Sequence, residues 1–65
     1  MASYEENLAV VRARAEEVWP ASVVDDWFTS PNLFLSGARP IDVLKLDGPD
    51  VLLGVLDAEE GGVYA

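Results

Sequence analysis

Four prolines divide this 65-residue chain into short segments. The residue before a proline is pushed away from helical angles, so the pair Trp19-Pro20 predicts the end of a first helix. Proline is also favoured at the first position of a helix, where its missing N–H breaks no bond. Pro31, Pro40 and Pro49 are therefore expected to open later helical segments. Long helices are excluded, and the chain is predicted to be all-α, a small bundle of about four short helices.

The first helix is expected over residues 3–18. Ser3 and Glu6 have the spacing of a capping box, in which each side chain bonds the backbone N–H of the other residue. The apolar residues of this segment recur at helical spacing and form one narrow stripe, which consists of Leu8, Val11, Ala15 and Val18. We therefore expect one apolar side that faces a core and charged residues on the other sides.

The second helix is expected to begin at Ser22 and to end near Thr29. Ser22 and Asp25 form a weaker capping-box pattern, because Asp is shorter than the usual Glu. The apolar residues of this segment are expected to face inward, and they are Val23, Val24, Trp27 and Phe28. A core position is favoured for Trp27, whereas Trp19, at the corner before the proline, is equally consistent with the core and with an interface anchor.

A single helical turn is expected next, with Ser30 as its cap, Pro31 at its first position and Leu35 near its end. Gly37 is expected to close it in the left-handed conformation. Pro40 then opens the third helix, and three apolar residues are expected to point inward, namely Ile41, Val43 and Leu44.

The fourth helix is predicted to begin at Pro49 and to end near Glu60. Its apolar residues include Val51, Leu52, Val55 and Leu56. A strand over residues 51–56 is the weaker interpretation, because the run does not alternate between apolar and polar residues. Residues 61–65 are expected to form a C-terminal tail.

Cysteine and histidine are both absent, so disulfide and zinc staples are excluded. The length allows one domain, residues 1–65. Below about 70–80 residues a lone core seldom supplies more than about 3–5 kcal/mol of stability, although 51% of this chain is hydrophobic. We therefore expect a partner chain or self-association to supplement the stability.

The net charge is −8, from 12 acidic and 4 basic residues. This field repels nucleic-acid phosphates and anionic membrane surfaces, so neither is expected as a direct partner. An acidic chain instead associates readily with a basic groove or pocket. The N-terminus lacks the pattern of a signal peptide, and no apolar run approaches the roughly 20 residues needed to span a bilayer. A cytoplasmic location is therefore expected.

Few residues have the chemistry of a catalytic group. The candidates are the acidic pairs, namely Glu5-Glu6, Glu16-Glu17, Asp25-Asp26 and Glu59-Glu60. Neighbours in a helix point about 100° apart and do not converge on one substrate, so solvated faces and caps are the favoured roles. The serines have no base to activate them, and the stretch from Asp47 to Asp50 lacks the spaced ligands of a calcium loop. We expect no enzymatic activity, no metal and no cofactor.

An ordered set of residues begins inside the second expected helix. A tryptophan–hydrophobic pair comes first and is followed by a Pro-Asn turn, a leucine and a glycine. A basic residue, a proline, a hydrophobic residue and an acidic residue then follow in direct succession. In order, these residues are Trp27, Phe28, Pro31, Asn32, Leu35, Gly37, Arg39, Pro40, Ile41 and Asp42. A leucine-rich helix end, a glycine break and an amphipathic helix that finishes at a glycine follow, here Leu44, Gly48, Val51, Leu52, Val55, Leu56 and Gly61. From Val18 onward, over about two-thirds of the chain, this order resembles the toxin-binding domain of the Xre/MbcA/ParS antitoxin family.

The resemblance implies an antitoxin of a type II toxin–antitoxin system. Members of this family neutralise RES-type toxins, which consume NAD, by packing against the toxin and directing their C-terminal end into its NAD pocket. Residues 19–60 would then be the toxin-binding region, and the motif residues would be mainly structural. The contacts that close the pocket would come from Asp57, Glu59, Glu60, Gly61, Gly62, Val63, Tyr64 and Ala65. The chain would form a hetero-oligomer with the toxin, whose phosphate-holding pocket should be basic and so complement the acidic charge.

The chain departs from the family pattern at its N-terminus. Family members commonly carry a helix-turn-helix DNA-binding domain there, whereas this chain has one acidic helix, so operator binding is not expected. Met1 and the cap at Ser3 favour a natural start and a minimal antitoxin over a part of a longer protein. Two other functions stay open: a self-associating helical adaptor without a toxin, and a small transcriptional co-regulator, which would need a basic surface.

Overall fold

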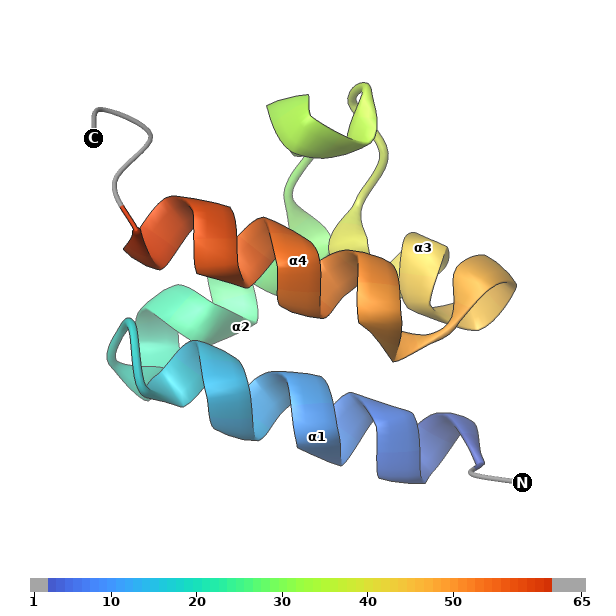
Figure 1. The fold of residues 1–65 in the computed structure, drawn as a ribbon, viewed down its shortest axis with the longest axis horizontal. Helices are drawn as coiled ribbons and strands as arrows, with labels where there is room; N and C mark the ends of the chain where they lie inside the picture. Colours follow the sequence, from blue (N-terminus) through green and yellow to red (C-terminus); the bar gives the residue numbers. More distant parts are fainter. Residues whose placement is uncertain (1–2, 62–65) are drawn as a thin grey trace.

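The computed structural model describes residues 3–61, which fold into a small all-α bundle (Figure 1). Its elements are α1 (Tyr4–Glu16), α2 (Ala21–Thr29), a 3₁₀ turn η1 (Leu33–Leu35), α3 (Pro40–Asp47) and α4 (Pro49–Glu60). Helices α1 and α4 lie side by side across the molecule, while α2 and α3 pack against each other and against α1 (Figure 1). The prediction of four short helices is confirmed for the described residues.

Helix α1 begins as its capping box predicts. The Ser3 hydroxyl accepts a hydrogen bond from the Glu6 N–H at 3.1 Å, and the Glu6 carboxylate accepts one from the Ser3 N–H at 3.3 Å. The helix ends at Glu16, two residues earlier than predicted, because the N–H groups of Glu17 and Val18 bond the carbonyls three residues back, those of Arg14 and Ala15, and tighten the last turn. Val18 is consequently only half-buried.

Helix α2 shows that the predicted capping box at Ser22 is wrong. The helix begins one residue earlier, at Ala21, with extended Pro20 as the cap and no side-chain hydrogen bond. The Pro20 carbonyl accepts from the N–H groups of Val23 and Val24 at 3.0 and 3.1 Å, so the chain is already helical at Ser22. Val23 was predicted to point inward but is exposed, whereas Val24 on the next face is buried.

The turn after α2 is also capped differently from the prediction. Asn32, rather than Ser30, caps η1: its side-chain oxygen accepts from the Phe34 N–H at 2.8 Å. The Ser30 hydroxyl instead donates to the Asp26 carbonyl at the end of α2. Ser36 adopts the left-handed conformation that closes η1, and Gly37 also has a positive φ of 89°, as predicted.

Helices α3 and α4 both start with a proline at their first position, as predicted for Pro40 and Pro49. Gly48 ends one helix and precedes the next, with a φ of 82° that favours glycine. Of the apolar residues in α4, Val51 is exposed, whereas Leu52, Val55 and Leu56 are buried. None of the helices within residues 3–61 is long and apolar enough to cross a membrane.

One hydrophobic core joins all four helices. Its buried residues are Val11, Ala15, Val24, Phe28, Val43, Leu44, Leu52 and Leu56. Partly buried side chains, including those of Trp19, Trp27 and Leu35, pack around it. Trp27 therefore belongs to the edge of the core, and this core fixes the position of the last turn of α4 relative to α1.

Candidate protein interface

The last turn of α4 concentrates acidic side chains. Asp57 and Glu60 are three residues apart and so project from one side of the helix, while Glu59 projects from another side. Carboxylates are unfavourable at this end of a helix, where the backbone dipole is negative. A compensating cation is therefore expected close by, and Arg14 of α1 provides it.

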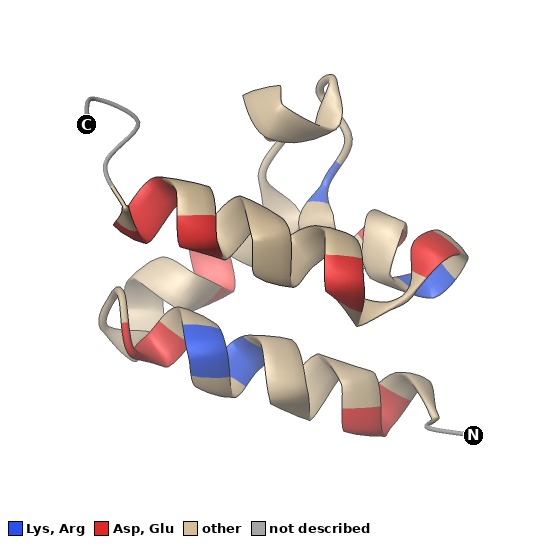
Figure 2. Cartoon of the chain, viewed as in Figure 1, with Lys and Arg blue, Asp and Glu red and all other residues tan. Residues whose placement is uncertain are grey.

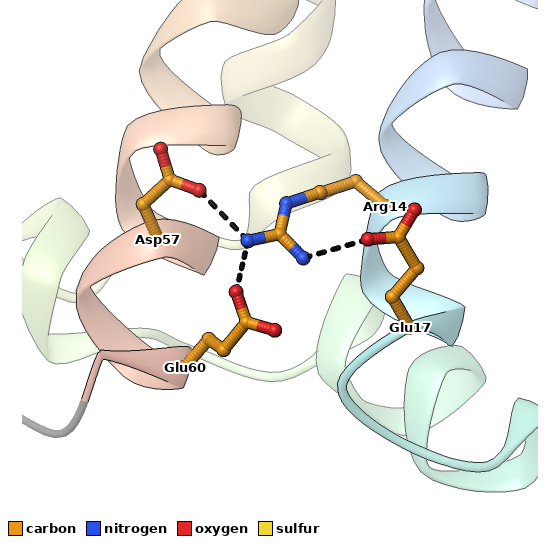
Figure 3. Close-up of polar contacts among 4 residues, drawn as sticks. All are labelled: Arg14, Glu17, Asp57 and Glu60. Atoms are coloured by element: carbon orange, nitrogen blue, oxygen red, sulfur yellow. Dashed lines mark hydrogen bonds and ion pairs between the residues drawn. The ribbon is translucent and has the colours of Figure 1, made fainter.

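Arg14 of α1 contacts three carboxylates, two on α4 and one on Glu17, the residue that follows α1 (Figure 3). Its Nη2 donates to Asp57 Oδ1 at 2.9 Å and also to Glu60, and its Nη1 donates to Glu17 Oε1 at 3.1 Å. Only 22% of the Arg14 side chain is exposed. The hydrogen bonds that Arg14 donates to Glu60 and Asp57 raise the pKa of its guanidinium further above the ordinary value, so the group stays charged. We call Arg14, Glu17, Asp57 and Glu60 the Arg14 cluster.

The Arg14 cluster is anionic as a whole, because three carboxylates surround one guanidinium and leave a formal charge of −2. The side chains of Glu17, Asp57 and Glu60 are 67%, 70% and 49% exposed. Their outer oxygens therefore face water and are open to a second cation. A cationic partner is the kind of molecule that this surface would attract.

Glu59 lies apart from the cluster and contacts Trp27. Its partial burial raises the pKa of the Glu59 carboxyl, and the nearby Trp27 indole N–H acts in the opposite direction. Glu59 Oε2 and Trp27 Nε1 are both buried, and their geometry falls short of a hydrogen bond, so neither has a partner within residues 3–61. Glu59 is thus a partly buried acid held against an aromatic ring system.

Trp27, which contacts Glu59 of α4, packs against two other aromatic rings. The Trp27 ring lies 5.9 Å from the Trp19 ring and 5.1 Å from the Phe28 ring, the latter edge to face. Trp27 and Phe28 are the first two residues of the motif noted in the sequence. Phe28 is buried, and Trp27 connects the core to Glu59.

The other motif residues build the loop and the start of α3. Asn32 is buried, Leu35 packs against the core, and Pro31 is exposed. Arg39 donates two hydrogen bonds to the Asp42 carboxylate, at 2.8 and 3.2 Å, and so lowers the pKa of Asp42. Pro40 is buried and Ile41 is half-buried beside the core.

The structure unites Asp57 and Glu60 around Arg14, places Glu59 on Trp27, and leaves Gly61 exposed after α4. The remaining residues of the expected contact lie outside the described range, namely Gly62, Val63, Tyr64 and Ala65. Sequence reasoning missed Arg14, because its partners are 43 and 46 residues away. The sequence did contain one indication of such a pairing: it has only four basic residues, so an acidic helix end would be expected to attract one of them.

Every basic residue of the described range makes an internal contact. Arg12 pairs with Glu16 and Asp25, Arg39 pairs with Asp42, and the Lys45 ammonium lies 5.7 Å from the centre of the Tyr4 ring. Acidic residues, in contrast, are spread over all four helices (Figure 2). The charge that this part of the chain offers to another molecule is therefore negative.

Two apolar residues that the sequence analysis did not single out are strongly exposed. Leu33 of η1 and Leu46 of α3 have exposed fractions of 96% and 83%. The consecutive residues Leu33, Phe34 and Leu35 were the signal, since the three side chains of one turn cannot all face the core. Leu35 turns inward, whereas Leu33 and Phe34 turn outward.

Known proteins supply no further guide. No family model, curated protein or solved structure matches this chain. Within residues 3–61, no three potential ligands gather into a metal site. The candidate site is the acidic end of α4, where the Arg14 cluster lies and where Glu59 contacts Trp27.

Proposed function

We propose that this chain is an antitoxin of the Xre/MbcA/ParS type, acting on a RES-type toxin that consumes NAD. The end of α4 and residues 61–65 occlude the active site of the toxin, and the antitoxin performs no chemistry of its own. It binds no cofactor, it works in the cytoplasm, and its functional form is a hetero-oligomer with the toxin.

The observation that carries the proposal is that several motif residues make contacts within the fold, whereas the acids at the end of α4 are exposed. The motif residues are used internally: Phe28 in the core, Asn32 in the loop, and Arg39 with Asp42 at the start of α3. They hold a scaffold, as the resemblance implies. The acids near the C-terminus stay available at the surface.

Charge supports a basic partner pocket. A pocket that accepts NAD must hold two phosphates, so cationic side chains or backbone N–H groups line it. The Arg14 cluster presents a formal charge of −2 to such a pocket. Arg14 holds Asp57 and Glu60 in place before binding, so less side-chain freedom is lost when the complex forms.

Co-expression tests the proposal. The product of the gene adjacent to that of this chain, which the proposal requires to be a RES-type toxin, is induced with and without the chain, and growth, intracellular NAD and complex formation are measured together. We expect the toxin alone to deplete NAD and arrest growth, and the chain to restore both while it co-purifies with the toxin.

The oligomeric state of the chain distinguishes the antitoxin from the self-associating adaptor. In sedimentation, the purified chain alone should show no association with further copies of itself, and a heavier species should form only when the toxin is added. Persistent growth arrest in the presence of a formed complex would overturn the proposal. Stable homo-oligomers with no affinity for the toxin would favour the adaptor.

A further inference from the structure

The segment from Asn32 to Ala38, here called the 32–38 loop, projects from the helices between α2 and α3 (Figure 1). The turn η1 lies at the tip of this loop, where Leu33 is 96% exposed and Phe34 is 50% exposed. An apolar side chain held almost wholly in water stabilises nothing within the described fold. Leu33 and Phe34 are consecutive and both exposed, so they present one apolar patch; such patches mark contacts with another molecule, whereas a single exposed apolar residue such as Leu46 does not.

The 32–38 loop is held in one shape by its own hydrogen bonds. The Asn32 N–H donates to the Ala38 carbonyl at 3.0 Å, which joins the two ends. The Asn32 carbonyl accepts from the N–H groups of Leu35 and Gly37 at 3.0 and 2.9 Å, and its side chain accepts from Phe34. Leu35 anchors the loop to the core. A preorganised loop loses little conformational entropy when its tip is bound.

The loop is uncharged and stands within an acidic molecule. No charged residue occurs from Thr29 to Ala38. At one foot of the loop, Arg39 is neutralised by Asp42. The last acidic residue before the loop in the sequence is Asp26 of α2, which is exposed and makes no ion pair within residues 3–61. A partner that receives the tip therefore needs an apolar recess for Leu33 and Phe34 and cationic groups around it.

We infer that the 32–38 loop is a second contact with the toxin: its tip inserts into an apolar recess with a cationic rim, outside the NAD pocket. The inference rests on the proposed function, since it assigns the loop to the same basic partner. A second copy of this chain is disfavoured as the occupant, because each copy has a net charge of −8 and no basic residue within residues 3–61 free of an internal contact. The loop then supplies docking, and the end of α4 supplies occlusion.

The test compares two exposed leucines. Leu33→Gln removes the apolar tip, and Leu46→Gln makes the same change at the exposed end of α3. The affinity of each variant for the purified RES-domain toxin is measured by calorimetry. We expect Leu33→Gln to weaken binding about tenfold or more, as for the loss of one buried leucine. Leu46→Gln should bind as the unmodified chain does, and Leu33→Met should retain most of the affinity.

The outcomes separate the two proposals. Circular dichroism and urea midpoints establish that each variant is folded, which the near-complete exposure of Leu33 favours. Equal affinities of the unmodified chain and Leu33→Gln would overturn the loop contact and leave the antitoxin proposal standing. Failure of the unmodified chain to bind the toxin would overturn both. A homodimer of the unmodified chain that Leu33→Gln dissociates would assign the loop to a second copy and refute the inference.

Discussion

At the scale of single residues, the least expected position is that of Glu59. An acid that is partly buried against an indole ring is more costly to ionise than one in water, so its pKa lies above the ordinary value of 4.5. Below that value the carboxyl is protonated in both the folded and the unfolded chain, and its burial costs little. As the pH rises through the folded-state pKa, the folded chain must give up the proton, and stability falls.

We therefore expect Glu59→Gln to raise the free energy of unfolding at pH 7, with a gain that shrinks as the pH falls below 4.5. Glutamine keeps an oxygen that can accept from Trp27 Nε1. Urea denaturation at pH 7 and at pH 4, at one ionic strength, measures the difference between the two chains.

Glu5→Gln is the matched control, because Glu5 is exposed at the start of α1 and its substitution removes the same single charge. It should give no such gain, since an acid in the first turn is favoured by the helix dipole. Equal stabilisation by both substitutions would mean that relief of the net negative charge, rather than the burial of Glu59, limits stability.

At the scale of elements, α4 is held by the core through Leu52, which is fully buried, with 0% of its surface exposed. Leu52→Ala should cost about 2–5 kcal/mol, the usual range for a leucine cavity. A domain of this size has a total stability of about 3–10 kcal/mol, so the variant should be largely unfolded or close to it. Thermal and urea denaturation followed by circular dichroism measure the loss.

Leu46→Ala is the control in α3, where the leucine has 83% of its surface exposed. It should change the free energy of unfolding by less than about 0.5 kcal/mol. A comparable loss at both sites would show that Leu46 is covered in solution, as in an unrecognised oligomer.

The sequence predicted those elements whose causes are local. The capping box at Ser3 and the prolines at positions 40 and 49 act within one turn, so their patterns sufficed. Ser22 and Ser30 were wrong as caps because two competitors, Pro20 and Asn32, also fitted. A pattern shows that a cap is possible but does not rank neighbouring candidates.

Burial and charge pairing were less predictable, because they depend on how the helices pack. Val23 and Val51 lie next to buried residues in their helices, and only the direction of the neighbouring helix decides which residue faces inward. Arg14 meets Asp57 and Glu60 only after α1 and α4 have come together. The acidity of the candidate site was therefore predictable, and its organisation around one arginine was not.

At the scale of the whole molecule, the small core and the acidic surface have a common consequence. Any partner that binds only the folded form raises the apparent free energy of unfolding of such a chain, by an amount that grows with the partner's concentration. Under the proposed function, a basic toxin both relieves the repulsion among the carboxylates and holds the bundle folded. Recognition and stability are then coupled through the same complex.

Docking and occlusion are separable in such a complex, and deletion of residues 62–65 tests the separation. The helices and the Arg14 cluster remain, so affinity for the toxin should fall by less than about tenfold, or about 1.4 kcal/mol. Occlusion requires the deleted segment, so NAD should still reach the pocket of a toxin that is fully bound. Calorimetry measures the affinity, and NAD consumption at a saturating concentration of the chain measures the occlusion.

The double substitution of Asp57→Asn and Glu60→Gln provides the opposite case. It keeps the full length but removes two carboxylates of the Arg14 cluster, so binding and inhibition should weaken together, and inhibition should return when the concentration is raised. The truncated chain should behave differently: the toxin should keep consuming NAD at any concentration of the truncated chain, because NAD reaches the pocket of both bound and unbound toxin. Complete inhibition by the saturating truncated chain would place the occluding group within residues 1–61, and the end of α4 would then suffice for occlusion without residues 62–65.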